Sequence, residues 1–176
     1  VVPKTLWSRE KPADEQNRIL FGTNCLLIEA GAELVLVDTG LGDKQDAKFR
    51  SIYAYEEGAT RLPESIAAAG FDLGDVTHVV LSRLHFDHCG WNTRRDAAGK
   101  VVPTFPNARY WLNRGEVEHA RNPSERDRAS YFPENWEPLV EAGVVEAFAG
   151  AAQIVPGVRA VKVPGHNADM CVITID

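Results

Sequence analysis

Two short apolar runs near the start of the chain restrict the fold more than any other feature. Residues 25–30 (CLLIEA) and 34–38 (LVLVD) flank a three-residue turn that begins with Gly31, which is the pattern of a β-hairpin. A hairpin pairs its two strands antiparallel, whereas parallel strands need a long crossover connection. The sequence therefore argues against an all-parallel sheet.

Helical and extended patterns alternate after this hairpin. Residues 62–69 have helical spacing, with Gly70 as the stop, and further helices are predicted over 114–121, capped by Asn113, and over 135–142. Strands are predicted over 76–82, 108–112, 144–148, 153–155, 158–163 and 170–175, with a polar loop joining the first two of these. This order predicts a single α+β domain over residues 1–176, with layered sheets and outer helices.

Charge and cysteine usage narrow the partners and the location. The net charge is −6, and the Lys and Arg residues are scattered, so nucleic acid is not expected as a partner. No apolar run approaches the length of a membrane span, so no membrane partner is expected either. The three cysteines include no CxxC pair, which argues against a disulfide framework or a zinc knuckle and favours a reducing, cytoplasmic location.

The chemistry of the chain concentrates in residues 80–91 (VLSRLHFDHCGW), directly after a predicted strand. His85, Asp87 and His88 fall within four residues there, and His166 follows another predicted strand at a Pro-Gly turn. Imidazole nitrogen and carboxylate oxygen suit a borderline divalent cation such as zinc. These four residues are therefore the predicted metal ligands.

The remaining histidines, cysteines and aromatic residues have simpler interpretations. His78 lies inside a predicted strand and His119 on a polar helix, so both are expected to be structural or exposed. Cys89 is expected to be a small buried packing residue, although its position also suits a ligand or a reactive thiol. Core packing is the default for five aromatic residues, of which one or two are expected to reach a substrate pocket: Trp91, Trp111, Tyr131, Phe132 and Trp136.

Three motifs together resemble the metallo-β-lactamase superfamily. Residues 82–88 (SRLHFDH) are similar to its H-x-H-x-D-H signature, residues 36–40 (LVDTG) to its aspartate turn, and residues 164–166 (PGH) to its later histidine turn. They occur in the family's order and cover nearly the whole chain. The stretches 21–25 and 113–116 look most like the branch of N-acyl-homoserine lactonases and methyl parathion hydrolase-type enzymes.

This resemblance implies an αβ/βα sandwich with a two-zinc site at one edge. In the family pattern, position 83, His85 and His166 would hold the first metal, so His85 and His166 are expected to lie close in space. Asp87 and His88 would hold the second metal, with further ligands from later in the chain.

The resemblance also implies a hydrolase of small-molecule substrates. A metal-bound hydroxide would attack an ester, lactone, amide or phosphoester. Asp87 is the expected catalytic residue as well as a ligand, and Asp38 is expected to orient the histidine turn by hydrogen bonds.

Two departures from the family pattern put this activity in question. Arg83 stands where the family has histidine, and a guanidinium group has no lone pair to offer a metal. A cation about 4 Å from a divalent ion opposes its binding by roughly several kcal/mol, even at an effective dielectric constant of about 20. The family's last ligands would lie beyond residue 176, so the second half of the sandwich is expected to be incomplete, with one zinc ion or none bound.

Three hypotheses follow. In the first, the parent protein is a binuclear hydrolase of small esters or lactones. In the second, the chain is a catalytically impaired member that acts as a binding or assembly module. In the third, it is an enzyme with one metal, held by Asp87, His88 and ligands beyond residue 176. Metal content distinguishes the three hypotheses. Two equivalents of metal per chain would support the binuclear hydrolase, none the binding module, and one the single-metal enzyme. Residues 170–175 are in addition expected to expose a strand edge that favours homo-oligomers.

Overall fold

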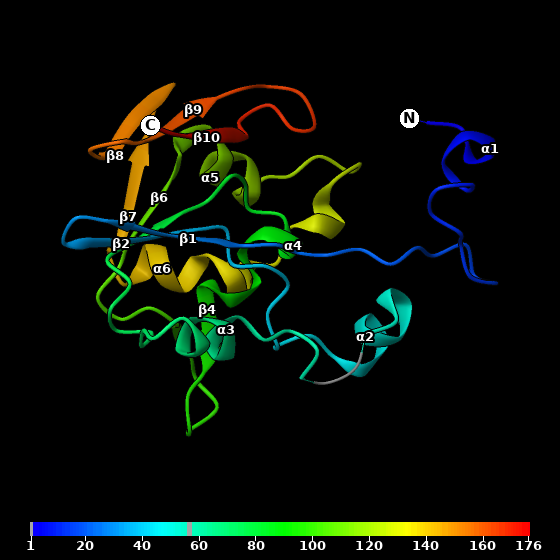
Figure 1. The fold of residues 1–176 in the computed structure, drawn as a ribbon, viewed down its shortest axis with the longest axis horizontal. Coiled ribbons are helices and arrows are strands. Elements are labelled where there is room, and N and C mark those ends of the chain that lie inside the picture. The colour runs from blue at the N-terminus through cyan, green and yellow to red at the C-terminus, as the bar shows by residue number, and fades with distance from the viewer. Residues whose placement is uncertain (1, 56–57) are drawn as a thin grey trace.

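The computed structural model describes residues 2–55 and 58–176 and contains a central five-stranded sheet (Figure 1). Its strand order is β1-β2-β3-β6-β7, with β1 and β2 antiparallel and β2, β3, β6 and β7 parallel. The bounds are β1 (Leu26–Ala30), β2 (Glu33–Val37), β3 (His78–Val80), β6 (Arg109–Asn113) and β7 (Val145–Phe148). The predicted hairpin is confirmed, and the sheet is mixed as expected.

A second, antiparallel sheet lies beside the first and has the order β10-β9-β8. Its strands are β8 (Ala151–Val155), β9 (Val158–Lys162) and β10 (Cys171–Ile175), close to the predicted ranges. β10 is an edge strand of this sheet, and Val172 and Ile175 on it are 42% and 50% exposed.

Alternating side chains of the main sheet separate two hydrophobic cores. Leu34 and Leu36 of β2 face a core that includes residues of α3 (Leu62–Ala68), α5 (Arg114–Arg121) and α6 (Glu137–Glu141). Val35, between them, packs into a second core with residues of the three-stranded sheet. Successive strand residues point to opposite faces, so one alternating strand covers both cores. The result is an α+β arrangement of helices, main sheet and second sheet.

The sequence predicts a polar loop over residues 83–107. That prediction is wrong, because the segment contains regular structure. It forms α4 (Phe86–Cys89), a 3₁₀ turn (Gly90–Asn92) and a two-stranded hairpin of β4 (Thr93–Arg95) and β5 (Val101–Pro103). These elements are too short for periodicity to reveal them. Burial stabilises α4 and the 3₁₀ turn instead, since Phe86 and Cys89 of α4 and all three residues of the turn are buried.

Two helices were not predicted, α1 (Lys4–Trp7) and α2 (Ala47–Tyr53). The Asp46 side chain caps α2 by accepting a hydrogen bond from the Phe49 N–H at 2.7 Å. Neither helix has a buried residue, so neither carries the apolar stripe by which helices are recognised. α1 lies well away from the sheets in Figure 1. No helix in the described ranges is long and apolar enough to cross a bilayer.

Candidate metal centre

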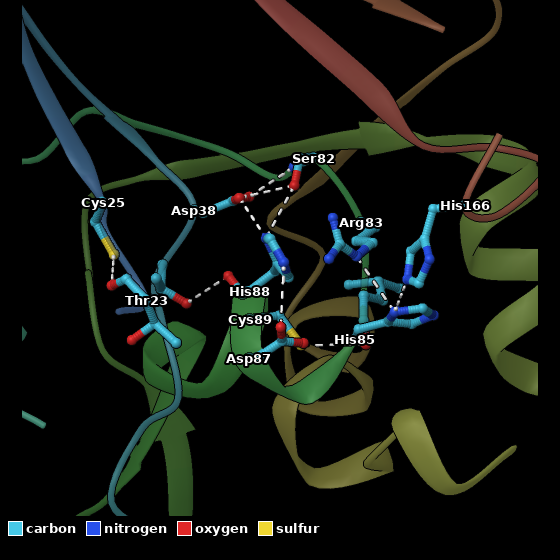
Figure 2. A network of polar contacts seen from close by, with 12 residues as sticks. Thr23, Cys25, Asp38, Ser82, Arg83, His85, Asp87, His88, Cys89 and His166 are labelled. Carbon is cyan, nitrogen blue, oxygen red and sulfur yellow. Dashed lines mark hydrogen bonds and ion pairs between the residues drawn. The ribbon is translucent and has the colours of Figure 1, made fainter. Parts of the chain in front are cut away.

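The residues of the predicted site meet at one edge of the main sheet (Figure 2). β2 and β3 are parallel neighbours, so the turns that follow them, at Asp38 and at Ser82, emerge at the same edge. The turn after β9 brings His166 to the same place, and β10 begins with the Cys171 N–H donating to the Ser82 carbonyl at 2.8 Å. Parallel strand ends from one sheet and a turn from the other therefore build the site together.

Asp38 holds the turn after β3 through three hydrogen bonds. Its Oδ1 accepts from the Ser82 N–H at 2.7 Å, and its Oδ2 accepts from Ser82 Oγ at 2.7 Å and contacts His88 Nδ1 at 2.6 Å. In addition, the Thr39 N–H donates to the His88 carbonyl at 2.7 Å. When Nδ1 donates to a carboxylate, the Nε2 of that ring is left to bind a ligand. This geometry suits the orienting role that the resemblance implies for Asp38.

Asp87 and His88 form one pair of candidate ligands. His88 Nε2 lies 3.4 Å from Asp87 Oδ2. Burial opposes the protonation of His88, but hydrogen bonds to Asp38 and Asp87 raise its pKa to about 9. Burial acts to raise the pKa of Asp87, but the hydrogen bond to His88 outweighs it, and the net shift is downward. Both pKa shifts favour the charged form of each partner, so the His88 Nε2 has to lose its proton before it can bind a metal.

His85 and His166 form the other pair. The distance from His85 Nδ1 to His166 Nε2 is 3.2 Å, which confirms the prediction that these two residues lie close together. His85 is buried and its Nε2 has no hydrogen-bond partner. Burial, followed by the positive charge of Arg83 and the neighbouring His166, lowers the pKa of His85 to about 4. His85 is therefore a neutral imidazole at pH 7.

Arg83 is bound into the site rather than turned away from it. Its Nε donates to His85 Nδ1 at 3.2 Å, and Figure 2 draws its side chain between His88 and His166. The Nδ1 lone pair of His85 thus already accepts a hydrogen bond from a permanent cation.

The four candidate ligands fit a zinc-type ion in kind but not in number. Nitrogen and carboxylate oxygen donors are those that zinc accepts. Within residues 2–55 and 58–176, however, no three His, Cys, Asp or Glu side chains form a group that could hold a metal. The Asp87–His88 pair offers two ligands supported by Asp38. The His85–His166 pair, with Arg83 bound to it, does not fit a metal in this arrangement.

A cavity of about 690 Å³ lies next to the site and includes Asp87 in its wall. Most of its lining is apolar: Ile19, Leu20, Phe21, Leu41, Ile52, Tyr53 and Phe86. Phe86 stacks on Phe132 with ring centroids 5.3 Å apart. None of the five aromatic residues considered from the sequence is in this lining. Trp91 instead borders a separate cavity of about 330 Å³.

Sequence reasoning also missed Glu116 as part of the support of the site. Glu116 is 2% exposed on α5 and contacts residues next to both His85 and His166. Burial raises the pKa of its carboxyl group, and the hydrogen bonds that it accepts from Leu84, Tyr131 and Asn167 oppose that shift. The sequence feature that could have pointed to Glu116 is its position in the first turn of a predicted helix that directly follows a predicted strand.

His78 and His119, which were expected to be structural or exposed, bond to residues outside these pairs. His78 accepts a hydrogen bond from Trp111 Nε1 at 2.9 Å, and His119 pairs with Asp127 at 2.8 Å. Cys89 is fully buried, and all three cysteines are free.

Comparisons with known proteins agree with these motifs. Residues 18–176 match the family described as the Metallo-beta-lactamase superfamily. A probable metallo-hydrolase of Mycobacterium tuberculosis is 32% identical over 172 residues, which cover 86% of this chain and 51% of that protein. An N-acyl homoserine lactonase of Bacillus cereus is 26% identical over 152 residues, covering 81% of this chain and 54% of that protein.

Solved structures resemble the fold over much of the chain. A probable metal-dependent hydrolase from Staphylococcus aureus has a TM-score of 0.87 at 27% identity and covers 100% of this chain and 61% of that one. A dizinc quorum-quenching lactonase, solved in complex with a product, N-hexanoyl-L-homoserine, has a TM-score of 0.67 at 26% identity, covering 87% of this chain and 52% of that one. The chain spans about half the length of the curated relatives that it matches. The match over residues 18–176 shows that the chain belongs to the metallo-beta-lactamase superfamily.

Proposed function

We propose that this single domain belongs to a metal-dependent hydrolase of small esters or lactones. The observation that carries the proposal is the Asp87–His88 pair, with Asp38 bonded to the far nitrogen of His88. Membership of the superfamily and the names of its relatives support the same reaction class. Zinc is the proposed metal, because one structural relative is described as a dizinc lactonase.

Of the four candidate ligands Asp87, His88, His85 and His166, only Asp87 and His88 are proposed to hold a metal in this chain. A divalent ion would supply Lewis acidity, which activates water and stabilises negative charge that develops on the substrate. Asp38 fixes the ring of His88 and keeps its Nε2 beside Asp87. We propose a single ion at Asp87 and His88, because Arg83 already donates to His85 Nδ1.

The cavity beside Asp87 supports an uncharged, apolar substrate. Its wall combines aliphatic and aromatic side chains, and the charged residues at its border, Asp14 and Arg18, pair with each other at 2.7 Å. A cavity of this size and character suits an acyl or aryl group of a small ligand. Esters and lactones with an apolar acyl chain are therefore the proposed substrate class.

Metal content and hydrolysis, measured on the same protein, test this function. The protein is dialysed against zinc, its metal is determined by mass spectrometry, and it is assayed with hexanoyl-homoserine lactone and a nitrophenyl ester. We expect about one equivalent of zinc and hydrolysis that a chelator abolishes. Asp87→Asn should lose both the metal and the activity, whereas Asp72→Asn, at an exposed position, should keep both.

The competing hypothesis predicts a different result. A catalytically impaired binding module would take up no zinc and hydrolyse neither substrate. That result, from protein that unfolds cooperatively, would contradict the proposed function.

A further inference from the structure

The side chain of Glu116 lies between the two turns that carry His85 and His166. It projects from the first turn of α5, whose N-terminus is capped by the Asn113 side chain accepting from the Gly115 N–H at 3.1 Å. Glu116 is 2% exposed, so its contacts with the protein replace those with water. A buried carboxylate is stable only when hydrogen bonds satisfy its oxygens.

The hydrogen bonds that satisfy Glu116 come from both histidine turns. The Leu84 N–H donates to Oε1 at 2.8 Å, and Leu84 directly precedes His85. The Asn167 Nδ2 donates to Oε1 at 3.1 Å and to Oε2 at 3.0 Å, and Asn167 directly follows His166. One carboxylate therefore ties together two turns that lie far apart in the sequence.

A third donor connects Glu116 to the face of the His85 ring. Tyr131 Oη donates to Glu116 Oε1 at 3.2 Å. The Tyr131 ring also packs edge-on against the His85 ring, with centroids 4.9 Å apart and an interplanar angle of 79°. The same carboxylate thus supports His85 through the backbone before it and through a ring beside it.

The close approach of α5 to the His166 turn makes these contacts possible. A Cβ atom added to Gly115 would lie 2.2 Å from Asp169 Oδ1, so a larger residue at this position would displace the Asp169 side chain. The Asp169 N–H in turn donates to Asn167 Oδ1 at 3.1 Å, which fixes the direction of the Asn167 amide. The nitrogen and the oxygen of the Asn167 amide are therefore both already hydrogen-bonded.

We propose that Glu116 is a positioning residue, which holds His85 and His166 at the separation found in the structure. Only an acceptor-only side chain satisfies donors from Leu84, Tyr131 and Asn167 together. The role of these histidines toward a metal rests on the proposed function, but their separation does not.

The replacement Glu116→Gln tests the proposal with almost no change of shape. Because Asn167 contacts both oxygens, either orientation of the glutamine amide places N–H groups against the Asn167 Nδ2. Rotation of Asn167 does not relieve this clash, since its Oδ1 accepts from Asp169. The double variant Glu116→Gln with Asn167→Asp lets the introduced amide N–H donate to the introduced carboxylate, and should restore one of the two hydrogen bonds between these positions. Glu118→Gln, on an exposed face of the same helix, is the matched control.

The first readout is the NMR contact between the rings of His85 and His166, measured in metal-free protein. The centroids of the two rings are 5.0 Å apart. We expect this contact to vanish in Glu116→Gln, return in the double variant and persist in Glu118→Gln. The second readout is cobalt affinity from visible absorption in an Arg83→His background, because that substitution frees the His85–His166 pair to bind a metal. In this background we expect the affinity to fall by about 10- to 100-fold with Glu116→Gln and to recover in the double variant.

A ring contact that persists in folded Glu116→Gln, or that the double variant fails to restore, would overturn the proposal. If Glu116→Gln does not fold, Asn167→Ala applies the same test, because it removes the link to the His166 turn and leaves Leu84 and Tyr131 bonded. Ring contacts that follow the expected pattern while no variant binds cobalt would uphold the positioning role and contradict the metal site.

Discussion

Arg83 Nε lies 3.2 Å from His85 Nδ1, so a permanent cation is hydrogen-bonded to one of the candidate metal ligands. A guanidinium group keeps its charge at any ordinary pH and offers no lone pair. It therefore satisfies the His85 nitrogen and repels a cation at the same point. This contact is the physical reason for proposing one metal ion in a family with a dizinc member.

Replacing Arg83 with histidine should increase metal binding at the His85–His166 pair. The substitution removes the cation and adds a third nitrogen ligand, which together should raise zinc affinity there by at least about 10-fold. Zinc content measured by mass spectrometry after dialysis should rise from about one equivalent toward two, with faster lactone hydrolysis. Arg83→Gln is the control, because it removes the charge without supplying a strong ligand. Equal zinc content in Arg83→His and the unmodified protein would show that Arg83 does not block a metal.

Asp38→Asn should weaken metal binding through His88. The amide would place N–H groups toward His88 Nδ1 and Ser82 Oγ, where the carboxylate Oδ2 now accepts. The ring would then turn or change tautomer, and zinc affinity measured by calorimetry should fall by about 10- to 100-fold. Asp43→Asn, at an exposed position in the same turn region, should leave the affinity unchanged. A loss of the same size in both variants would mean that general charge, not orientation, is responsible.

Lys44 should make a pH-dependent contribution to stability. Its Nζ donates to the Thr93 carbonyl at 2.6 Å, and burial lowers its pKa from 10.5 to about 8. Between these two pKa values the unfolded chain binds more protons than the folded one, so this contribution to the free energy of unfolding rises with pH.

The variant Lys44→Met has no ionisable group at this position. Comparing it with the unmodified protein therefore separates the effect of Lys44 from that of buried cysteines and tyrosines that titrate at alkaline pH. Urea unfolding is measured for both proteins from about pH 7.5 to 10.5, spanning the window set by the two pKa values. The stability of the unmodified protein minus that of Lys44→Met should rise across the window. A flat or falling difference would contradict the depressed pKa.

The exposed edge of β10 should lead to self-association. β10 pairs only with β9 among the described strands, and Val172 on it is 42% exposed. An unpaired edge with apolar side chains draws in a second chain. Sedimentation at micromolar concentration should show dimers or larger species, and Val172→Lys should shift them toward monomer. Ala98→Lys, at an exposed loop position, adds the same charge elsewhere and should leave the assembly unchanged.

The sequence predicted those parts of the molecule in which local pattern and burial agree. Leu34, Val35 and Leu36 alternate between two cores, so their strand was apparent from the residues alone. α2 has no buried residue and therefore left no apolar stripe to recognise. The four candidate ligands were found because each follows a strand within a recognisable motif.

Glu116 was not predicted, because its role depends on partners at positions 84 and 167. That pairing exists only once the tertiary structure has formed. The apolar cavity was missed for a related reason. Its wall includes Phe21 and Ile52, which are more than half exposed and resemble ordinary surface residues in the sequence.

The wide sequence separation of the site residues has a consequence for folding kinetics. Asp38 contacts His88 across 50 positions, and His85 contacts His166 across 81. Contacts of such long range form after the local helices and the β1–β2 hairpin, because closing long loops costs entropy before any contact compensates for it. The ring contact between His85 and His166 should accordingly be among the last native features to appear during refolding. Its rate of appearance would report the docking of the second sheet onto the first.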